Sequence, residues 1–214
     1  MSAIKIMVKG WVKVLPFYLL ILLPLFMSCS EADDTPEEYA NWQAKNEAYF
    51  EEQYQKHLAA SSSTCFVLKS YTKGDKLNVS EVAHTDCILV DVLPSDFPSK
   101  GDKTTSPLFT DDATIHYRGC LLPSLSYPTG YVFDVSYSDM FAKNISGAEP
   151  VVLSVNGLIA GFSTALQHMH RGDYWRVTIP YQLGYGASAN SSIPAFSTLI
   201  FEIRLVDFEP ADNG

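Results

Sequence analysis

The chain has 214 residues, of which 47% are hydrophobic and 18% charged, and its formal net charge is −9. This composition is typical of a folded domain and excludes a collagen-like fibre or a disordered tail. The length allows one domain of moderate size, with or without an appendage. The negative balance argues against nucleic acid as a partner, because phosphate binding needs a basic face.

The first 28 residues are typical of a secretory signal peptide. A positively charged start, an apolar stretch over residues 14–27 and the small Ser28 follow one another in the expected order. Three lysines supply the charge: Lys5, Lys9 and Lys13. The apolar stretch is shorter than the ~20 residues of a membrane-spanning helix, and it contains two prolines. We therefore expect residues 1–28 to be removed, the alternatives being an uncleaved anchor or a buried helix.

The end of this segment, Leu25-Phe26-Met27-Ser28-Cys29, resembles the lipobox of bacterial lipoproteins and departs from it at Phe26. The resemblance implies cleavage before Cys29, a lipid anchor on its thiol, and a place at the outer membrane of the cell envelope, facing the periplasm or the surface. Cleavage removes three lysines and no acid, which changes the formal net charge from −9 to −12. Lipid rather than charge must therefore hold the mature chain at an anionic membrane.

Three further cysteines follow: Cys65, Cys87 and Cys120. An odd number cannot all pair within one chain, although an exported compartment permits disulfides. The sequence alone leaves open whether Cys65 and Cys87 form a disulfide. The cysteine spacings match no zinc template, and we expect no metal or other cofactor.

Residues 29–62 are predicted to form an acidic tether and an N-terminal helix. Thr35, Pro36 and Glu38 have the spacing of a capping box. The helix is expected to reach about Leu58, with one broad apolar side made of Tyr39, Trp42, Tyr49, Phe50, Tyr54 and Leu58. We expect this side to pack on its own domain, and the alternative is a homodimer through residues 35–60.

Residues 63–210 are predicted to form one α+β domain. Seven segments are typical of short antiparallel strands: 65–70, 86–93, 113–120, 131–135, 151–155, 174–179 and 199–205. One amphipathic helix carries an apolar stripe from Leu158 to Met169 and stops before Gly172. A single helix among antiparallel strands indicates a sheet that curls over it.

Motifs over about residues 86–208 together resemble FKBP-type peptidyl-prolyl isomerases. Each motif is weak alone, and their order and spacing make the resemblance specific. They are His116-Tyr117-Arg118-Gly119 with Val132-Phe133-Asp134, Leu158-Ile159-Ala160-Gly161-Phe162, the run from Ala165 to Gly172, Arg176-Val177-Thr178-Ile179-Pro180 with Gly184-Tyr185-Gly186, and Ile193-Pro194 with the run from Ser197 to Glu202.

The resemblance implies an antiparallel half-barrel sheet wrapped around the short helix, with an apolar pocket between them. It assigns catalytic positions to Tyr117, Phe133, Asp134, Ile159, Phe162, Tyr185 and Phe201, and substrate-binding positions to Val151, Leu158 and Ile193. The implied activity is isomerisation of X-Pro bonds in folding envelope or exported proteins, without metal or nucleotide. Proline-containing polypeptides are the implied partners.

Such a pocket accelerates isomerisation without a nucleophile. Amide resonance creates a barrier of ~18–20 kcal/mol, and the twisted amide at its top has lost that resonance. An apolar aromatic site therefore suits the twisted form better than water does. Departures from the family pattern at Val151, Ala195 and the short 187–192 loop keep a second hypothesis open, a non-catalytic binding or chaperone module of the same fold. Phe162 also replaces the usual Trp at the pocket floor.

Overall fold

The computed structural model describes residues 37–74, 77–95, 104–137 and 149–210. The expected signal peptide, Cys29 and Thr35 lie outside these residues. The chain from Glu37 onward belongs to one compact unit. Within the described ranges, no helix combines the length and the hydropathy that crossing a membrane requires.

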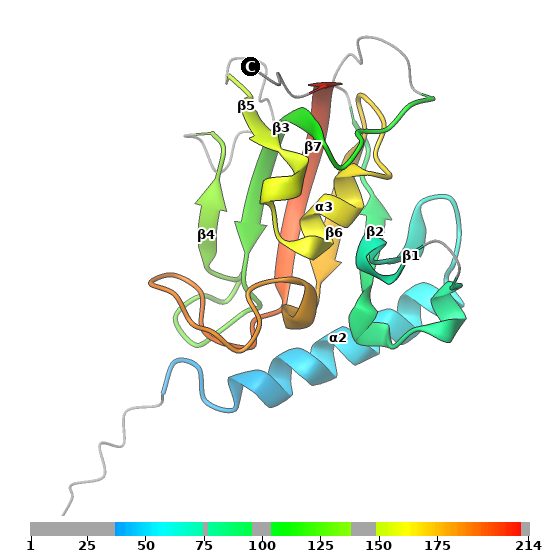
Figure 1. The fold of residues 1–214 in the computed structure, drawn as a ribbon. Coiled ribbons are helices and arrows are strands. Elements are labelled where there is room, and N and C mark those ends of the chain that lie inside the picture. Colours follow the sequence, from blue (N-terminus) through cyan, green and yellow to red (C-terminus); the bar gives the residue numbers. More distant parts are fainter. Residues whose placement is uncertain (1–36, 75–76, 96–103, 138–148, 211–214) are drawn as a thin grey trace, which may run out of the picture. The chain divides into compact units, whose positions relative to one another are not determined.

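A seven-stranded antiparallel sheet forms the body of this unit (Figure 1). Its strands are β1 (Cys65–Lys69), β2 (Cys87–Val92), β3 (Asp111–Cys120), β4 (Val132–Val135), β5 (Val151–Ser154), β6 (Tyr174–Ile179) and β7 (Leu199–Pro210). They are ordered β1-β2-β6-β7-β3-β4, and β5 also pairs with β3. Because β5 pairs with the first half of β3 and β4 with the second half, both lie along the edge of β3 that faces away from β7. The seven predicted strands are all present.

The periodicity of β7 shows why the sheet has one buried face. Leu199, Phe201, Ile203 and Leu205 are buried, and the residues between them are less so. This two-residue alternation directs every second side chain to the same face of the sheet. The pairing of β3 with β7 shifts between Thr114 and Ile115, and such a bulge bends the strand that carries it.

Helix α3 (Ala160–Leu166) covers this face and contacts β2 and β6 (Figure 1). Every residue from Gly161 to Leu166 is buried, as expected for a helix enclosed by a sheet. A side chain at position 161 would lie 2.3 Å from Cγ2 of Ile179, so glycine allows α3 to approach β6 closely. The predicted α+β fold, with a sheet around one short helix, is confirmed.

The N-terminal helix α2 (Trp42–Ala59) begins later than the capping-box spacing predicts. Its N-cap Asn41 has φ = 53°, a left-handed conformation that a right-handed helix cannot pass through, and residues 38–41 form turns. The predicted helix is therefore wrong over residues 37–41, and its expected cap at Thr35 and Pro36 lies outside the described residues. Leu58 is also misassigned, because its side chain is 44% exposed. The buried face consists of Trp42, Asn46, Phe50, Tyr54 and His57.

This face of α2 packs on the chain's own sheet and loops. Nε1 of Trp42 donates a hydrogen bond to Oγ of Ser197 at 2.8 Å, and the backbone N–H of Thr198 donates to Oδ1 of Asn46 at 2.7 Å. Phe50 packs in a second buried cluster with residues of β2. The expected self-docking is confirmed, and the buried face is not available for the homodimer that the sequence left open.

Cys65, Cys87 and Cys120 are free thiols. The disulfide between Cys65 and Cys87 is excluded by the register of β1 and β2. That register places Cys65 opposite Asp91 and Cys87 opposite Lys69, at opposite ends of the strand pair.

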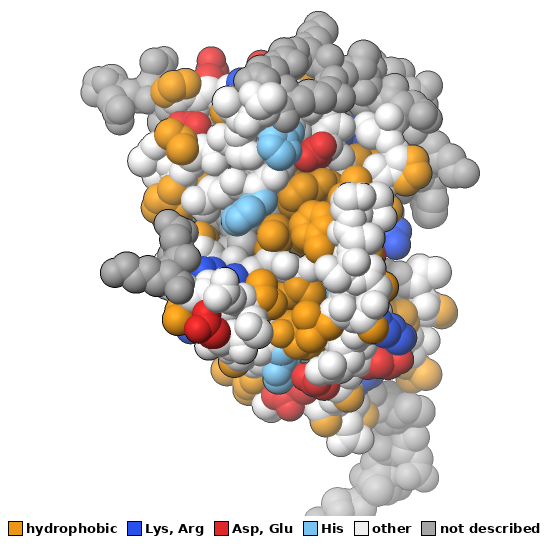
Figure 2. Space-filling model, turned by 90° about the vertical axis from the view of Figure 1, so that its right-hand side faces the viewer, with side chains coloured by type: hydrophobic (Ala, Val, Ile, Leu, Met, Phe, Trp, Pro, Cys, Tyr) orange, Lys and Arg blue, Asp and Glu red, His pale blue; other side chains and the backbone are white. Residues whose placement is uncertain are grey.

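Figure 2 shows one face of the molecule, on which hydrophobic side chains gather in a central hollow. Acidic, basic and histidine side chains lie around this hollow, and the basic ones stay near the margins. This face therefore presents an apolar centre with a mixed polar border.

Candidate active site

Four aromatic rings from four elements meet on the face of the sheet that α3 covers. They belong to Tyr117 in β3, Phe133 in β4, Phe162 in α3 and Phe201 in β7. Phe162 and Phe201 meet edge to face with ring centroids 5.0 Å apart, and Phe133 and Phe201 do so at 5.5 Å. Tyr117 lies edge-on to Phe162 at 6.0 Å. These are favourable geometries for aromatic rings, and they give the site rigid apolar walls.

The close approach of two of these rings depends on a glycine. Gly119 of β3 lies opposite Asp134 in β4 and opposite Phe201 in β7. A Cβ at position 119 would lie 2.6 Å from Cζ of Phe133 and 2.7 Å from Cε1 of Phe201. Both distances are below van der Waals contact. The missing side chain at Gly119 therefore gives the two phenyl rings their room.

The rings line a cavity of about 180 Å³. The cavity wall is formed by Tyr117, Phe133, Asp134, Leu153, Gly157, Leu158, Ile159, Phe162, Tyr185 and Phe201. All seven positions to which the sequence gives catalytic roles are in this set, and so is the predicted substrate-binding Leu158. The structure brings them together, and their roles stay predictions.

Two phenols and one carboxylate supply the polar groups of the cavity. The Tyr117 hydroxyl donates a hydrogen bond to Oδ2 of Asp134 at 2.7 Å, and the Val135 N–H donates to Oδ1 of Asp134 at 2.8 Å. Burial raises the pKa of Tyr117, and the hydrogen bond to Asp134 raises it further, so this phenol stays protonated. Burial, together with the charge of Asp134, also raises the pKa of Tyr185. The Tyr185 side chain is 45% exposed and remains accessible to a ligand.

Ile159 places a backbone group beside the cavity. It is the N-cap of α3, with extended backbone angles, and its carbonyl accepts from the N–H of Ser163. Its own N–H has no acceptor among the residues that the structure describes. The first N–H groups of a helix have no partner within the helix. A donor is thus available at the edge of an apolar site.

Two predicted substrate-binding residues do not line this cavity. Val151 stands at the start of β5, opposite Ile115, and Leu153, two residues closer to α3, takes its place in the wall. Because side chains alternate along a strand, Leu153 lies on the same face of β5 as Val151. This alternation is the sequence signal that could have identified Leu153 as a cavity residue. Gly157 also lines the cavity, and no pattern in the sequence pointed to it.

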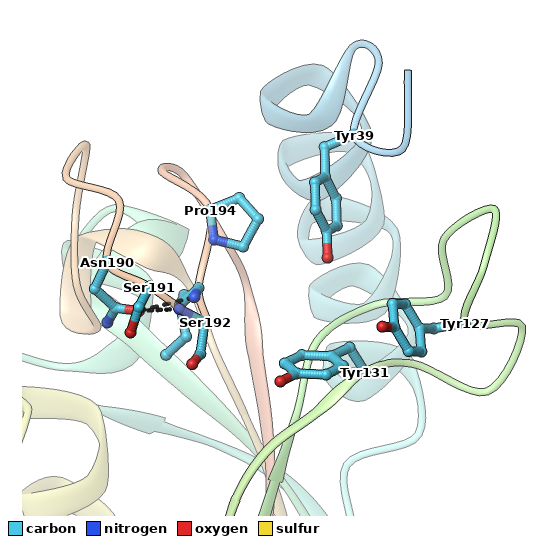
Figure 3. Close-up of a pocket in the computed structure, with 8 residues that line it drawn as sticks. Tyr39, Tyr127, Tyr131, Asn190, Ser191, Ser192 and Pro194 are labelled. Carbon is cyan, nitrogen blue, oxygen red and sulfur yellow. Dashed lines mark hydrogen bonds between the residues drawn. The ribbon is translucent and has the colours of Figure 1, made fainter. Parts of the chain in front are cut away.

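The third residue of the predicted substrate-binding set, Ile193, lines a second cavity of about 320 Å³ (Figure 3). Three tyrosines on one side face the 190–194 segment on the other: Tyr39, Tyr127 and Tyr131. The Oδ1 atom of Asn190 accepts hydrogen bonds from the N–H groups of Ser192 and Ile193, which fixes this turn. The turn draws Ile193 into the core, where its side chain is 4% exposed.

Residues 103–206 match the family model of the FKBP-type peptidyl-prolyl cis-trans isomerases. The FKBP-type 22 kDa peptidyl-prolyl cis-trans isomerase of Escherichia coli K12 is 40% identical over 102 residues, which cover 47% of this chain and 43% of that protein. The macrophage infectivity potentiator of Trypanosoma cruzi is 32% identical over 117 residues, covering 54% of this chain and 53% of that protein. The chain thus spans about half the length of these curated relatives.

Solved structures show the same fold. The crystal structure of FkpA from Escherichia coli superposes with a TM-score of 0.53 and 26% identity, covering 80% of this chain and 63% of that chain. A peptidyl-prolyl cis-trans isomerase from Pseudomonas syringae pv. tomato has a TM-score of 0.51 at 23% identity, covering 82% of this chain and 98% of that chain. At this identity the second likeness concerns the fold alone.

Proposed function

We propose that the chain belongs to the FKBP-type peptidyl-prolyl cis-trans isomerase family, whose model matches residues 103–206, and that it accelerates rotation about X-Pro bonds in other polypeptides. The observation that supports the proposal is the aromatic cavity between β3, β4, β7 and α3, with Asp134 and Tyr185 at its border. The proposed isomerisation itself requires no cofactor, because rotation about an amide breaks no covalent bond.

The cavity lowers the barrier by binding the twisted amide more tightly than either planar isomer. The uncatalysed X-Pro bond isomerises over tens to hundreds of seconds, and each 1.36 kcal/mol of differential binding is worth a factor of ten in rate. In the twisted state the amide carbonyl carries less charge and needs less water. The edge-to-face rings of Tyr117, Phe162 and Phe201 pack against the proline ring and exclude water from the X-Pro bond.

Each polar group then has a distinct task. The Ile159 N–H donates a hydrogen bond to the substrate carbonyl that follows proline, which orients the substrate. The Tyr185 hydroxyl, at the exposed border of the cavity, hydrogen-bonds the substrate backbone. Asp134 holds the Tyr117 ring through their 2.7 Å hydrogen bond and sets the field in the pocket.

The test is isomerisation of a short X-Pro peptide by the purified chain, beside the variants Asp134→Ala and Tyr185→Phe. We expect a clear acceleration, with kcat/KM about 2- to 10-fold lower in Tyr185→Phe, since one hydrogen bond is worth about 0.5–1.5 kcal/mol. Tyr181→Phe is the matched control, because its hydroxyl bonds Glu47 on α2 at 3.1 Å, outside the cavity. Binding of the peptide without acceleration by the folded chain would overturn the isomerase proposal and leave the binding module.

We also propose that the chain is exported and works at the cell envelope on folding proteins. The order of charged, apolar and small residues before Cys29 supports export, and the lipobox-like end supports a lipid anchor on that thiol. In this proposal residues 29–62 carry the tether and α2, and residues 63–210 carry the isomerase domain.

A further inference from the structure

Three side chains with metal-binding atoms meet away from the isomerase cavity. They come from three elements: His57 from the last turn of α2, Cys65 from the first position of β1, and Asp91 from β2. One ligand atom of each residue lies within 4.8 Å of those of the other two. In the described part of the chain, no other three such groups come this close.

The backbone alone fixes two of the three positions. Cys65 and Asp91 are direct cross-strand partners in the antiparallel pairing of β1 and β2. Partners of this kind have Cβ atoms about 4.5–5.5 Å apart on one face of a sheet. Helix α2 packs over this strand pair and presents His57 to it, with the histidine 7% exposed.

The hydrogen bonds of His57 aim its second nitrogen at the other two groups. Nδ1 lies 2.9 Å from the carbonyl oxygen of Gln53, and a carbonyl can only accept, so Nδ1 carries a proton. Nε2 is buried and makes no hydrogen bond within the described residues, although Oδ1 of Asp91 lies 3.3 Å away. In a neutral imidazole this leaves a lone pair facing a carboxylate. Such an arrangement calls for a positive charge between them.

We propose that His57, Cys65 and Asp91 bind one Zn²⁺ ion. Thiolate, imidazole and carboxylate are the ligand types that zinc takes in proteins. With Zn–N and Zn–O bonds of about 2.0–2.2 Å and tetrahedral angles, the nitrogen and oxygen should be about 3.4 Å apart, close to the distance between Nε2 and Oδ1. The Gln53 carbonyl supplies the outer contact that orients a metal-binding histidine.

The charges and the exposure also suit this ion. On binding, the Cys65 thiol transfers its proton to water, and thiolate plus carboxylate then neutralise the two positive charges of zinc. Arg176 lies opposite Asp91 in the pairing of β2 with β6, but its guanidinium is engaged with Glu202 at 2.8 Å. The Asp91 side chain is 39% exposed, so the fourth coordination position faces solvent and takes a water molecule.

The probes are Zn²⁺ and Co²⁺ added to the full-length chain in a mild non-ionic detergent, with binding followed by equilibrium dialysis and by the thiolate-to-cobalt absorption band. We expect one equivalent of either ion per chain, and a thermal midpoint that rises with zinc concentration. The variants His57→Gln, Cys65→Ser and Asp91→Asn should each bind the ion at least about 100-fold more weakly. Even the loss of an outer-shell partner costs about 10- to 100-fold in metal affinity.

His84→Gln is the matched control, because Nε2 of His84 lies 3.3 Å from a carboxylate oxygen of Glu51, with no thiol in the cluster. This variant should bind zinc as the unchanged chain does. The proposal is overturned if the chain binds neither ion, if cobalt binds without the thiolate band, or if the three ligand variants and His84→Gln lose binding alike. In those cases His57 and Asp91 form a plain ion pair with a proton between them. Near-ultraviolet circular dichroism of each variant verifies that it is folded.

Discussion

A hydrogen atom in place of a side chain at Gly119 allows two phenyl rings to meet near the C-terminal end of β3. The neighbouring atoms belong to rings held edge to face with others, so they cannot swing away singly. The geometry of the cavity is therefore set by a residue that does not line it. Any added side-chain volume at such a position forces its packed neighbours to move, which destabilises the fold.

The substitution Gly119→Ala should destabilise the domain by about 1–3 kcal/mol, the usual cost of forcing a methyl group into a packed core. It should also lower isomerase activity, because Phe133 and Phe201 must move. Denaturant unfolding and the X-Pro peptide assay measure the two effects. Gly157→Ala is the control for stability, since a Cβ there meets nothing within 4 Å. Equal stability of the two variants would contradict the argument.

At the scale of elements, the outer side of β7 carries a charged cluster that joins three strands. Glu202 lies opposite Arg176 in β6 and opposite Arg118 in β3. Its carboxylate accepts from Nη2 of Arg176 at 2.8 Å and from the Tyr174 hydroxyl at 2.9 Å. Burial alone would raise the pKa of Glu202, but these hydrogen bonds outweigh it and hold the pKa below its ordinary value.

A carboxylate with a lowered pKa in the folded state stabilises the fold at pH values above its unfolded pKa, here 4.5. That contribution is lost as the pH falls through the folded pKa. Glu202→Gln should therefore lower the free energy of unfolding by about 1 kcal/mol at pH 7, a figure discounted for the half-exposed Arg176. The difference from the unchanged chain should shrink below about pH 4. Denaturant unfolding across pH measures it.

Glu209→Gln, at the exposed end of the same strand, is the control for this pH dependence. Its free energy of unfolding should not show a deficit at pH 7 that disappears at acidic pH. A deficit in Glu202→Gln that stays constant from pH 7 to pH 3 would mean that packing, rather than charge, explains the effect.

Across the whole molecule, the sequence predicts what periodicity encodes and misses what backbone geometry and register decide. The strands and α3 follow from alternating and helical patterns, and the motif spacing identified all the residues that make up the aromatic walls. The start of α2 was missed because a left-handed Asn41 has no composition signal. The position of Ile193 beside the second cavity could not be predicted, because the Asn190 turn that directs it inward depends on side-chain hydrogen bonds.

The three proposed metal ligands show the same limit more clearly. Zinc templates rely on short spacings between ligands, whereas positions 57, 65 and 91 are separated by a loop and by most of a hairpin. Only the register of β1 with β2 and the docking of α2 bring them together. A sequence search for cysteine and histidine pairs therefore finds nothing at these positions.

The net charge of the mature chain bears on how a lipid anchor would have to work. A single acyl chain gives only marginal membrane binding, and a second signal, either another chain or a basic patch, is needed for stable attachment. Cleavage before Cys29 would leave a formal charge of −12, which supplies no attraction to anionic lipid. If the chain stays on the membrane, its anchor at Cys29 must therefore contain more than one acyl chain.

Mass spectrometry of the N-terminal peptide from a bacterial membrane fraction tests this prediction. We expect a peptide that begins at Cys29 and carries the mass of at least two acyl chains, and a Cys29→Ser variant that carries none. Cys65→Ser, which changes a cysteine inside the folded domain, should keep the acylated peptide. A membrane-bound chain that retains residues 1–28 with an unmodified Cys29 would show instead that the apolar stretch is an uncleaved anchor. A cleaved chain with one acyl group would mean that some contact other than lipid or charge holds the protein at the membrane.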